Sequence, residues 1–263
     1  MIALVTGASS GIGAEFARQL AARRYNLILV ARRMDRLEQL AADLAAAHGI
    51  STESLAADLT VDSELKTVEE RIARNGGIDL LVNNAGFGFP GHFWQTTVDT
   101  QDSLHRLHIM ATMRLTHAAL AAMTARNSGA VINVSSVAGF LPSSFGSTYG
   151  SSKAWINAFT EGLYLELKST GSAVKLQALC PGFTYSEFHD VAHMDRNVIP
   201  APLWLRAADV VAASLQGLDR GKLFVVPGWR YKLVVALVPV LPRFIRNPLI
   251  LQFGRRRGAG RKD

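Results

Sequence analysis

The chain contains one cysteine and few long apolar runs, and both shortages exclude whole classes of protein. Among 263 residues, Cys180 cannot form an intramolecular disulfide and leaves no cysteine-based metal site, which suits a reducing compartment. Residues 1–6 read as a strand and lack the charged and apolar segments of a secretion signal. Residues 233–241 are uncharged but are interrupted by Pro239 and fall far short of the about 20 residues that cross a bilayer. We expect a cytoplasmic protein without a transmembrane helix.

Acidic residues are almost missing from the last part of the chain. Residues 224–263 carry nine basic side chains and one acidic residue, Asp263, so their formal charge is +8; the whole chain has +7, and residues 1–223 therefore sum to −1. Aliphatic and aromatic residues separate these basic side chains. Two interpretations stay open: a segment that contacts an anionic membrane surface, or helices that pack over a substrate pocket or on a second subunit. We expect no nucleic-acid partner, because no base-stacking or groove-reading module accompanies the arginines.

Apolar, β-branched runs alternate with longer helical patterns, as in α/β proteins. We predict a Rossmann-type, doubly wound parallel sheet of seven strands with helices on both faces, followed by a C-terminal helical extension. The expected domains are a catalytic domain, residues 1–226, and a basic, apolar extension, residues 227–263. The predicted strands are residues 2–6, 26–31, 52–57, 78–83, 129–135, 173–180 and 222–226. The predicted helices are residues 11–23, 34–48, 61–75, 98–126, 148–168 and 206–218.

A glycine-rich loop follows the first predicted strand and has the spacing G-x-x-x-G-x-G. Glycines there let the backbone approach a pyrophosphate, and the following helix offers free N–H groups and the positive end of its dipole. A turn with only a structural role is the alternative, which its position directly after the first strand disfavours. The predicted phosphate-binding residues are Gly7, Ser9, Ser10, Gly11, Ile12 and Gly13.

The end of the second predicted strand bears on the choice between NAD and NADP. An NAD-selective site would place an acidic residue there to accept the ribose hydroxyls, but this chain has Ala31 followed by Arg32 and Arg33. Guanidinium groups bind a 2′-phosphate through paired, charge-assisted hydrogen bonds. Two solvated charges at a helix start are the alternative. We therefore predict NADPH or NADP+ as cofactor, with NADH disfavoured and Arg32 the stronger candidate of the two.

The candidate catalytic residues lie between positions 136 and 153. Tyr149 and Lys153 are four residues apart, so on a helix they project from one face. Lowering a tyrosine pKa from about 10 to about 7 requires roughly 4 kcal/mol of phenolate stabilisation, which one nearby ammonium group is able to supply. An ordinary surface pair on an amphipathic helix is the alternative. Together with Ser136, the pair predicts a tyrosine that works as an acid catalyst.

Several motifs occur in a fixed order along the chain. The glycine loop, Asp58, residues 83–86, Ser136, the pair Tyr149 and Lys153, and the Pro-Gly at 181–182 together resemble the short-chain dehydrogenase/reductase superfamily. The resemblance implies an oxidoreductase acting on CH–OH groups, in which a nicotinamide delivers hydride to a carbonyl carbon while Tyr149 protonates the oxygen. It further implies that Ser136 positions that oxygen, and that Lys153 binds the ribose hydroxyls and lowers the pKa of Tyr149.

The same resemblance implies further cofactor contacts. The acidic residue after the third strand would contact the adenine, residues 83–86 would form a wall beside the cofactor, and the segment after residue 181 would hold the nicotinamide carboxamide. A serine stands at position 186, where the family usually has threonine. The residues implied are Asp58, Leu59, Asn84, Ala85, Gly86, Pro181, Gly182, Phe183 and Ser186. No metal site is expected.

One position departs from the family pattern. The family usually has an asparagine in the long fourth helix, where it holds a water in a proton relay, and this chain has His108 in that register. Three roles stay open: its backbone carbonyl holds the water, its imidazole joins the relay, or it packs in the core. We expect His108→Asn to remain active.

The substrate should be apolar. Residues 183–205 occupy the place of a substrate lid in related enzymes, and they include His189 and His193, a conceivable metal pair without a third ligand. The lid and nearby aromatic residues predict a pocket for a hydrophobic ketone or 3-oxoacyl compound. Those residues are Phe87, Phe89, Phe93, Trp94, Phe140, Trp155 and Trp204.

These observations predict an NADPH-dependent carbonyl reductase acting on a hydrophobic small molecule. The first alternative is an NADP-dependent alcohol or hydroxy-acid dehydrogenase, since the same residues permit the oxidative direction. An alternative of another class is a non-catalytic NADP-binding sensor or scaffold that reaches a membrane through its basic extension. Related enzymes are commonly dimers or tetramers, so we also expect a homo-oligomer.

Overall fold

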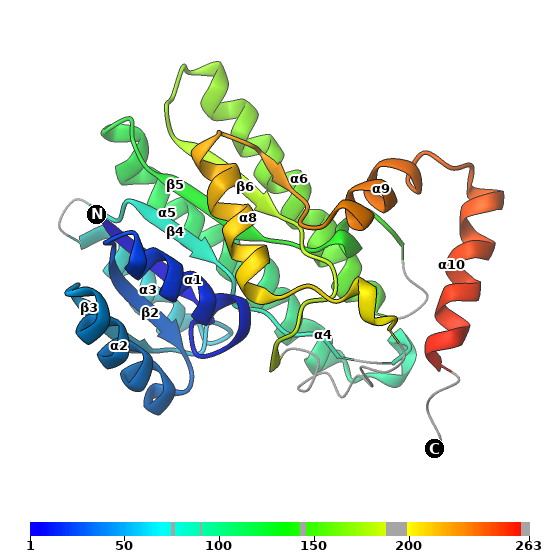
Figure 1. The fold of residues 1–263 in the computed structure, drawn as a ribbon, viewed down its shortest axis with the longest axis horizontal. Coiled ribbons are helices and arrows are strands. Elements are labelled where there is room, and N and C mark those ends of the chain that lie inside the picture. The colour runs from blue at the N-terminus through cyan, green and yellow to red at the C-terminus, as the bar shows by residue number, and fades with distance from the viewer. Residues whose placement is uncertain (75–76, 90, 143–145, 188–198, 259–263) are drawn as a thin grey trace.

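The computed structural model describes residues 1–74, 77–89, 91–142, 146–187 and 199–258, with side chains as far as residue 252. Its centre is one parallel sheet in which the seven strands lie in the order β3-β2-β1-β4-β5-β6-β7 (Figure 1). All strands are parallel, and the order in which they are added to the sheet reverses between β1 and β4, which makes this a doubly wound sheet and confirms the predicted fold class. The strands are β1 (Ile2–Thr6), β2 (Asn26–Ala31), β3 (Thr52–Ala56), β4 (Leu80–Asn83), β5 (Ala130–Val134), β6 (Lys175–Leu179) and β7 (Phe224–Val225).

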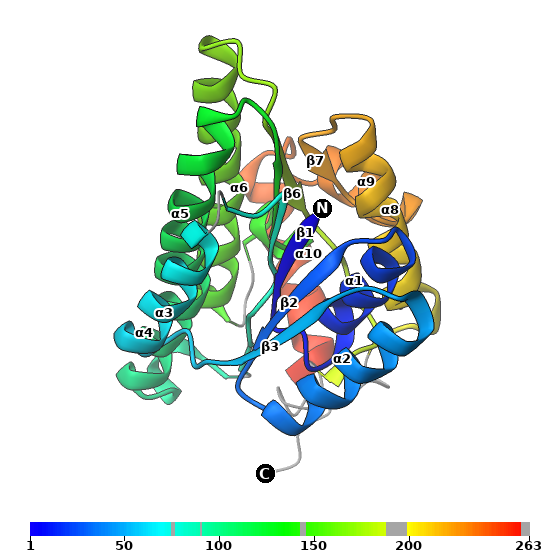
Figure 2. The ribbon, with the colours of Figure 1, turned by 90° about the vertical axis from the view of Figure 1, so that its left-hand side faces the viewer.

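Helices cover both faces of the sheet (Figure 2). On one face, α1 (Gly11–Ala22), α2 (Met34–His48) and α8 (Ala207–Asp219) pack on side chains such as Ala3 and Val5. On the other face, α3 (Asp62–Ala73), α5 (Thr112–Ala125) and α6 (Ser147–Ser169) pack on side chains such as Leu4. Successive residues of β1 thus enter opposite cores, which explains why the central strands are apolar at nearly every position.

The long helix predicted for residues 98–126 is interrupted. The structure has α4 (Val98–His105), a π-helical turn η3 (Arg106–Ala111) and then α5. A π turn holds one extra residue and rotates the side chains that follow it, and such turns often occur at functional sites. His108 lies inside η3, so the residue that departs from the family pattern stands where the helix is distorted.

Two helices follow β7 and lie outside the two layers. Helix α9 (Trp229–Leu237) and helix α10 (Arg243–Gly258) extend from the edge of the sheet, and α10 stands apart from the other helices (Figure 1). Within the described residues, no helix is both long enough and apolar enough to cross a membrane.

Candidate active site

The candidate site begins where β1 and β4 end, at the point where the strand order reverses. The hydroxyl of Thr6 accepts hydrogen bonds from the backbone N–H of Asn84 at 2.9 Å and of Ala85 at 3.0 Å. The side-chain amide of Asn84 donates to the carbonyl of Thr6 at 2.9 Å. These bonds join the start of the glycine loop to residues 84 and 85, and both segments are predicted to contact the same cofactor. In doubly wound sheets, ligands bind at this crevice.

Glycine is required at two positions of the loop because neighbouring atoms fill the space of a side chain. A Cβ atom at Gly13 would lie 2.2 Å from the carbonyl oxygen of Gly7, and one at Gly7 would lie 2.8 Å from the amide nitrogen of Asn84. Gly7 and Gly11 also have positive φ angles, 66° and 56°. The glycines therefore keep the backbone open to close approach at the start of α1, which fits the pyrophosphate of a nicotinamide dinucleotide.

The two arginines at the end of β2 lie beside this loop. The guanidinium of Arg33 donates to the hydroxyl of Ser9 at 3.0 Å, and Arg32 lies 3.8 Å from the carboxylate of Asp58 with 77% of its side chain exposed. Burial acts to raise the pKa of Asp58, but hydrogen bonds from Thr60 and the charge of Arg32 outweigh it and hold that pKa below its usual value. The donor set suits an adenosine ribose that carries a phosphate.

An acidic residue that sequence reasoning missed joins the same cluster. The carboxylate of Glu187 forms an ion pair with Arg33 at 3.0 Å and a second one with Arg36. The hydrogen bond from Arg36 is the main reason that the pKa of Glu187 is lowered. Close by, a Cβ atom at Gly11 would lie 2.9 Å from the side chain of Ser186. Residues 186 and 187 thus lie against the glycine loop and its arginines, as the predicted cofactor contact of Ser186 requires.

The three candidate catalytic side chains come together from β5 and α6. Ser136 follows β5, and its side chain hydrogen-bonds Tyr149 near the start of α6. The ammonium group of Lys153, one turn later, lies 5.7 Å from the centre of the Tyr149 ring and donates to the carbonyl of Val134 at 2.9 Å. The hydroxyl of Ser135 donates to the carbonyl of Lys153 at 2.9 Å and fixes that turn of the helix.

Burial reverses the pKa change that was expected for Tyr149. Loss of solvent raises the pKa of Tyr149 to about 12, against the lowering effect of the hydrogen bond with Ser136. Burial likewise lowers the pKa of Lys153 to about 7. Without a cofactor, both groups lie in a medium that disfavours their charged forms, and the lowering of the Tyr149 pKa by Lys153 with an oxidised nicotinamide stays a prediction.

His108 lies beside this group and is fully engaged in hydrogen bonds. Its Nε2 accepts the backbone N–H of Phe87 at 3.2 Å, so Nδ1 carries the proton and donates to the hydroxyl of Ser152 at 2.9 Å. That hydroxyl donates in turn to the carbonyl of Tyr149 at 2.8 Å. Burial holds the pKa of His108 well below its ordinary value, so the ring is neutral. The imidazole thus connects the segment after β4 to the first turns of α6.

Tyr231, on α9, is a second residue that sequence reasoning missed. Its ring covers Gly182, where a Cβ atom would lie 2.0 Å from the ring. Its hydroxyl accepts the N–H of Phe183 at 3.0 Å and donates to the carbonyl of Leu203 at 2.6 Å. The Gly-Phe pair predicted to hold the nicotinamide is therefore held in place by the C-terminal extension. The only feature of the sequence that pointed to this contact was an aromatic residue directly after the Pro-Gly-Trp-Arg segment.

The aromatic residues predicted to line one pocket fall into separate groups. Phe87 lies 6.2 Å from both Phe89 and the ring of His108, and His108 lies 5.7 Å from Tyr149, so this group reaches the catalytic residues. A second group joins the two ends of the predicted lid. The remaining contacts lie elsewhere: Trp94 stacks on His92, Trp155 on Phe159, and Phe140 packs on Phe224.

The two ends of the predicted lid lie side by side. Trp204 stacks on Tyr185 at 4.8 Å and contacts Phe183 at 5.8 Å. The N–H of Leu205 donates to the carbonyl of Phe183 at 2.8 Å, and the N–H of Tyr185 donates back to the carbonyl of Leu205 at 2.9 Å. The histidine pair at 189 and 193 lies outside the described residues.

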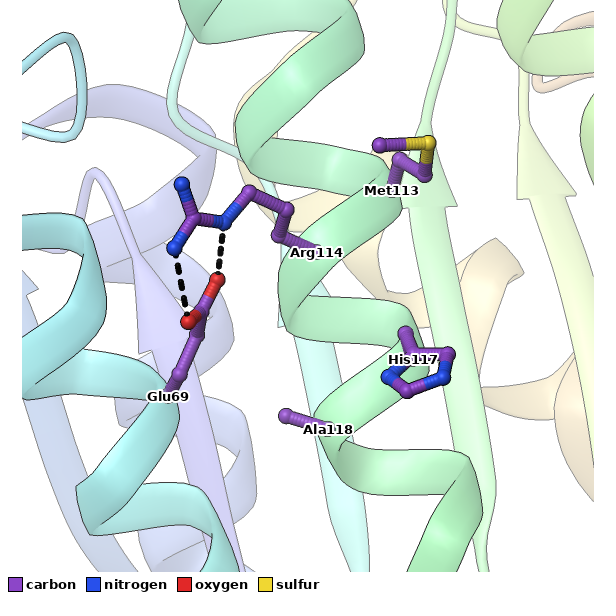
Figure 3. Close-up of a pocket in the computed structure, with 5 residues that line it drawn as sticks. All are labelled: Glu69, Met113, Arg114, His117 and Ala118. Atoms are coloured by element: carbon purple, nitrogen blue, oxygen red, sulfur yellow. Dashed lines mark hydrogen bonds and ion pairs between the residues drawn. The ribbon is translucent and has the colours of Figure 1, made fainter. Parts of the chain in front are cut away.

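A separate hollow of about 340 Å³ lies on the outer face of α3 and α5 (Figure 3). Glu69 on α3 and Arg114 on α5 form a paired ion contact there, with one N–O distance of 2.9 Å. None of the lining residues belongs to the candidate site. The lining residues are Glu69, Met113, Arg114, His117 and Ala118.

Comparison with known proteins agrees with this geometry. Residues 1–197 match the family model described as short chain dehydrogenase. A short-chain dehydrogenase from Sphingobium yanoikuyae, solved in complex with NADPH, is 35% identical over 95% of both chains, with a TM-score of 0.84. A bulky-bulky ketone specific alcohol dehydrogenase from Comamonas testosteroni is 31% identical over 100% of this chain and 95% of its own, with a TM-score of 0.77. A very-long-chain 3-oxoacyl-CoA reductase from Anas platyrhynchos is 30% identical over 88% of this chain and 75% of its own.

The chain therefore belongs to the short-chain dehydrogenase family. It is an oxidoreductase that acts on alcohol or ketone groups, and its fold is that of a nicotinamide-nucleotide-binding protein.

Proposed function

We propose that this protein is an NADPH-dependent carbonyl reductase for hydrophobic carbonyl compounds, with Ser136, Tyr149 and Lys153 as its catalytic residues. The observation that carries the proposal is the meeting of these three side chains beside a glycine-lined helix start. Bound NADPH would supply the hydride. The chain itself must bind the cofactor, orient the carbonyl group and donate a proton.

The proton is proposed to come from Tyr149. With a pKa of about 12, its phenol is protonated at neutral pH, which is the form that an acid catalyst needs to reduce a carbonyl group. Ser136 hydrogen-bonds the phenol and would share the substrate oxygen with it. The ammonium group of Lys153 favours phenolate once the proton has left, which offsets part of the cost of burial. Ser136 and Tyr149 already share a hydrogen bond, and the ammonium group of Lys153 lies 5.7 Å from the centre of the Tyr149 ring.

The proposed preference for NADPH rests on Arg32 and Arg33, which lie beside the adenosine end of the site without an acidic residue at position 31. The NADPH complex of the Sphingobium yanoikuyae relative supports it. The proposed substrate class rests on Phe87 and Phe89 beside His108, and on relatives named for bulky ketones and long-chain 3-oxoacyl thioesters. We expect an apolar ketone or a 3-oxoacyl compound.

The test of the reaction is the loss of NADPH absorbance over a panel of aliphatic ketones, aromatic aldehydes and 3-oxoacyl thioesters. Tyr149→Phe should lower turnover by at least about 100-fold while NADPH binding is kept, because only the proton donor is removed. Tyr164→Phe, on the same helix, is the matched control and should leave turnover unchanged. Full turnover in Tyr149→Phe would exclude the proposed mechanism.

The test of the cofactor is Arg32→Asp, assayed with NADPH and NADH side by side. We expect the ratio of kcat/KM values to move towards NADH by at least about tenfold, because a carboxylate repels the 2′-phosphate and accepts the ribose hydroxyls. An unchanged ratio would refute the assignment of Arg32.

We also infer that the protein works in the cytoplasm as a homo-oligomer. The inference of oligomerisation is supported by large apolar side chains that are exposed on this domain: Leu165 on α6 is 61% exposed and Met110 on η3 is 44% exposed. Light scattering on the purified chain measures the subunit number, and a monomer at micromolar concentration would contradict it.

A further inference from the structure

The extension after β7 exposes a run of large apolar side chains. Large apolar residues on α9, on α10 and in the connection between them project into solvent, with Phe244 79% and Val240 76% exposed. Surfaces of this kind on a soluble domain indicate an interaction site. We call these residues the apolar face of the extension: Trp229, Leu233, Val234, Leu237, Val240, Phe244, Ile245, Leu249 and Leu251.

Only basic charges accompany the apolar face. Lys232 and Arg243 are exposed beside it, and the guanidinium of Arg230 lies 4.7 Å above the ring of Trp229. From residue 224 to residue 262 the sequence has no acidic residue, and five further basic residues follow at positions 255–257, 261 and 262. Apolar, indole and basic groups in this combination match the acyl boundary and the anionic headgroups of a bilayer surface.

The extension is also held firmly to the rest of the protein at its first turn. Tyr231 is buried, its hydroxyl bridges Phe183 and Leu203, and Arg230 donates to the carbonyl of Pro202 at 3.2 Å. That turn is fixed beside the nicotinamide loop, while α10 stands apart from the other helices (Figure 1) and its large apolar side chains are exposed. The extension therefore presents the apolar face outwards.

We propose that the apolar face of the extension, Trp229 to Leu251, docks the protein on an anionic lipid surface. A second copy of this chain fits the face less well. A two-fold contact would bring the basic patch of one copy against the basic patch of the other, and residues 224–262 contain no acidic residue to pair with it. A nucleic acid would pair with the basic charges but would not bury the exposed aliphatic and aromatic groups. An anionic bilayer surface would pair with the basic charges and bury the apolar groups.

Co-sedimentation of the full chain with vesicles tests the proposal. We compare vesicles of phosphatidylcholine alone with vesicles that also contain phosphatidylglycerol. The wild-type chain should bind the anionic vesicles and not the neutral ones. The double variant Lys232→Gln with Arg243→Gln should bind about 25-fold more weakly, since each basic group near the surface contributes about fivefold.

A second variant tests the apolar contribution. Phe244→Asp should abolish vesicle binding, because it removes an inserted ring and adds a charge of the wrong sign. Val98→Asp, at a position on α4 that is 77% exposed, is the matched control and should bind as the wild type does. Turnover of a soluble ketone should stay unchanged in every variant, since none of these residues lies in the candidate site.

Three results would overturn the proposal. They are equal binding to neutral and anionic vesicles, no binding to either, and a dimer in solution that dissociates in Phe244→Asp. The last result would assign the apolar face to a subunit interface. Membrane docking does not depend on the proposed reaction. Vesicle binding by a chain without reductase activity would therefore still support the docking proposal.

Discussion

His108 stands where the family usually has an asparagine, and its two side-chain hydrogen bonds indicate what it does there. Its Nε2 accepts the N–H of Phe87 and its Nδ1 contacts the hydroxyl of Ser152, so both ring nitrogens are used in contacts that position the groups around Tyr149. The sequence left three roles open because the position of a histidine in the chain does not show whether its side chain packs in the core or takes part in a proton relay. The contacts favour a positioning role.

The variant His108→Asn should therefore remain active. We expect turnover within about tenfold of the wild type and a free energy of unfolding lowered by about 1–3 kcal/mol, because a shorter side chain leaves a buried donor or acceptor unpaired. Chemical denaturation measures the second quantity. His117→Asn, at an exposed position on α5, is the control and should change neither quantity. Complete loss of turnover with normal stability would show that the imidazole takes part in the chemistry.

Lys153 makes stability depend on pH in a direction that can be stated in advance. Burial lowers its pKa from 10.5 to about 7, so between these values the unfolded chain binds more protons than the folded chain, and stability rises with pH. From pH 6.5 to pH 9 the free energy of unfolding without cofactor should rise by roughly 2 kcal/mol from this residue.

The variant Lys153→Met isolates that contribution. Its free energy of unfolding, measured by urea denaturation at several pH values, should rise less between pH 6.5 and pH 9 than that of the wild type, and the difference should be the same roughly 2 kcal/mol. Tyr149 does not disturb the comparison, since its raised pKa acts only above about pH 10. Parallel curves for the two proteins would show that Lys153 keeps its proton in the folded state.

At the scale of elements, periodicity predicted the main strands and helices to within a few residues but missed the break in the long helix. The helical pattern of apolar residues continues through His108, and no proline or glycine marks the change. A π turn depends on tertiary contacts, here those of His108 with Phe87 after β4 and with Ser152 on α6, which local sequence does not report. The arrangement of α9 against Gly182 was missed for the same reason.

The variant Tyr231→Phe tests how α9 supports the nicotinamide loop. It keeps the ring over Gly182 and removes the hydroxyl that bridges Phe183 and Leu203. We expect the free energy of unfolding to fall by about 1–3 kcal/mol and the dissociation constant of NADPH to rise severalfold, with kcat less affected. Cofactor titration by fluorescence measures the change. An NADPH affinity equal to that of the wild type would mean that the bridge is only structural.

For the whole molecule, the motifs located the glycine loop, Ser136, Tyr149 and Lys153, because their spacing is fixed by backbone geometry. The burial of these side chains could not be predicted from motif spacing. The raised pKa of Tyr149 and the lowered pKa of Lys153 come from how the surrounding layers exclude water, and the ion pairs of Glu187 join residues that are 154 and 151 positions apart. Such contacts depend on the closed fold.

Cofactor binding should stabilise the whole chain. At 100 times its dissociation constant, NADPH contributes about 2.7 kcal/mol, which for a chain of this size corresponds to a rise of roughly 5–10 °C in Tm. NADH at the same concentration should give a smaller shift, and Arg32→Asp should reverse the order. Arg220→Asp, at an exposed position after α8, is the control. Equal shifts for both cofactors would contradict the proposed preference for NADPH.

The close packing of backbone around the glycine loop limits how this enzyme can be changed by random mutation. At Gly13, any side chain would meet the carbonyl of Gly7 at 2.2 Å, whereas at Gly162 and Gly171 nothing lies within 4 Å. A library that samples every amino acid and is selected for folded, cofactor-binding protein should therefore return glycine almost exclusively at position 13. Position 162, in the middle of α6, should accept alanine and most other helix-forming residues.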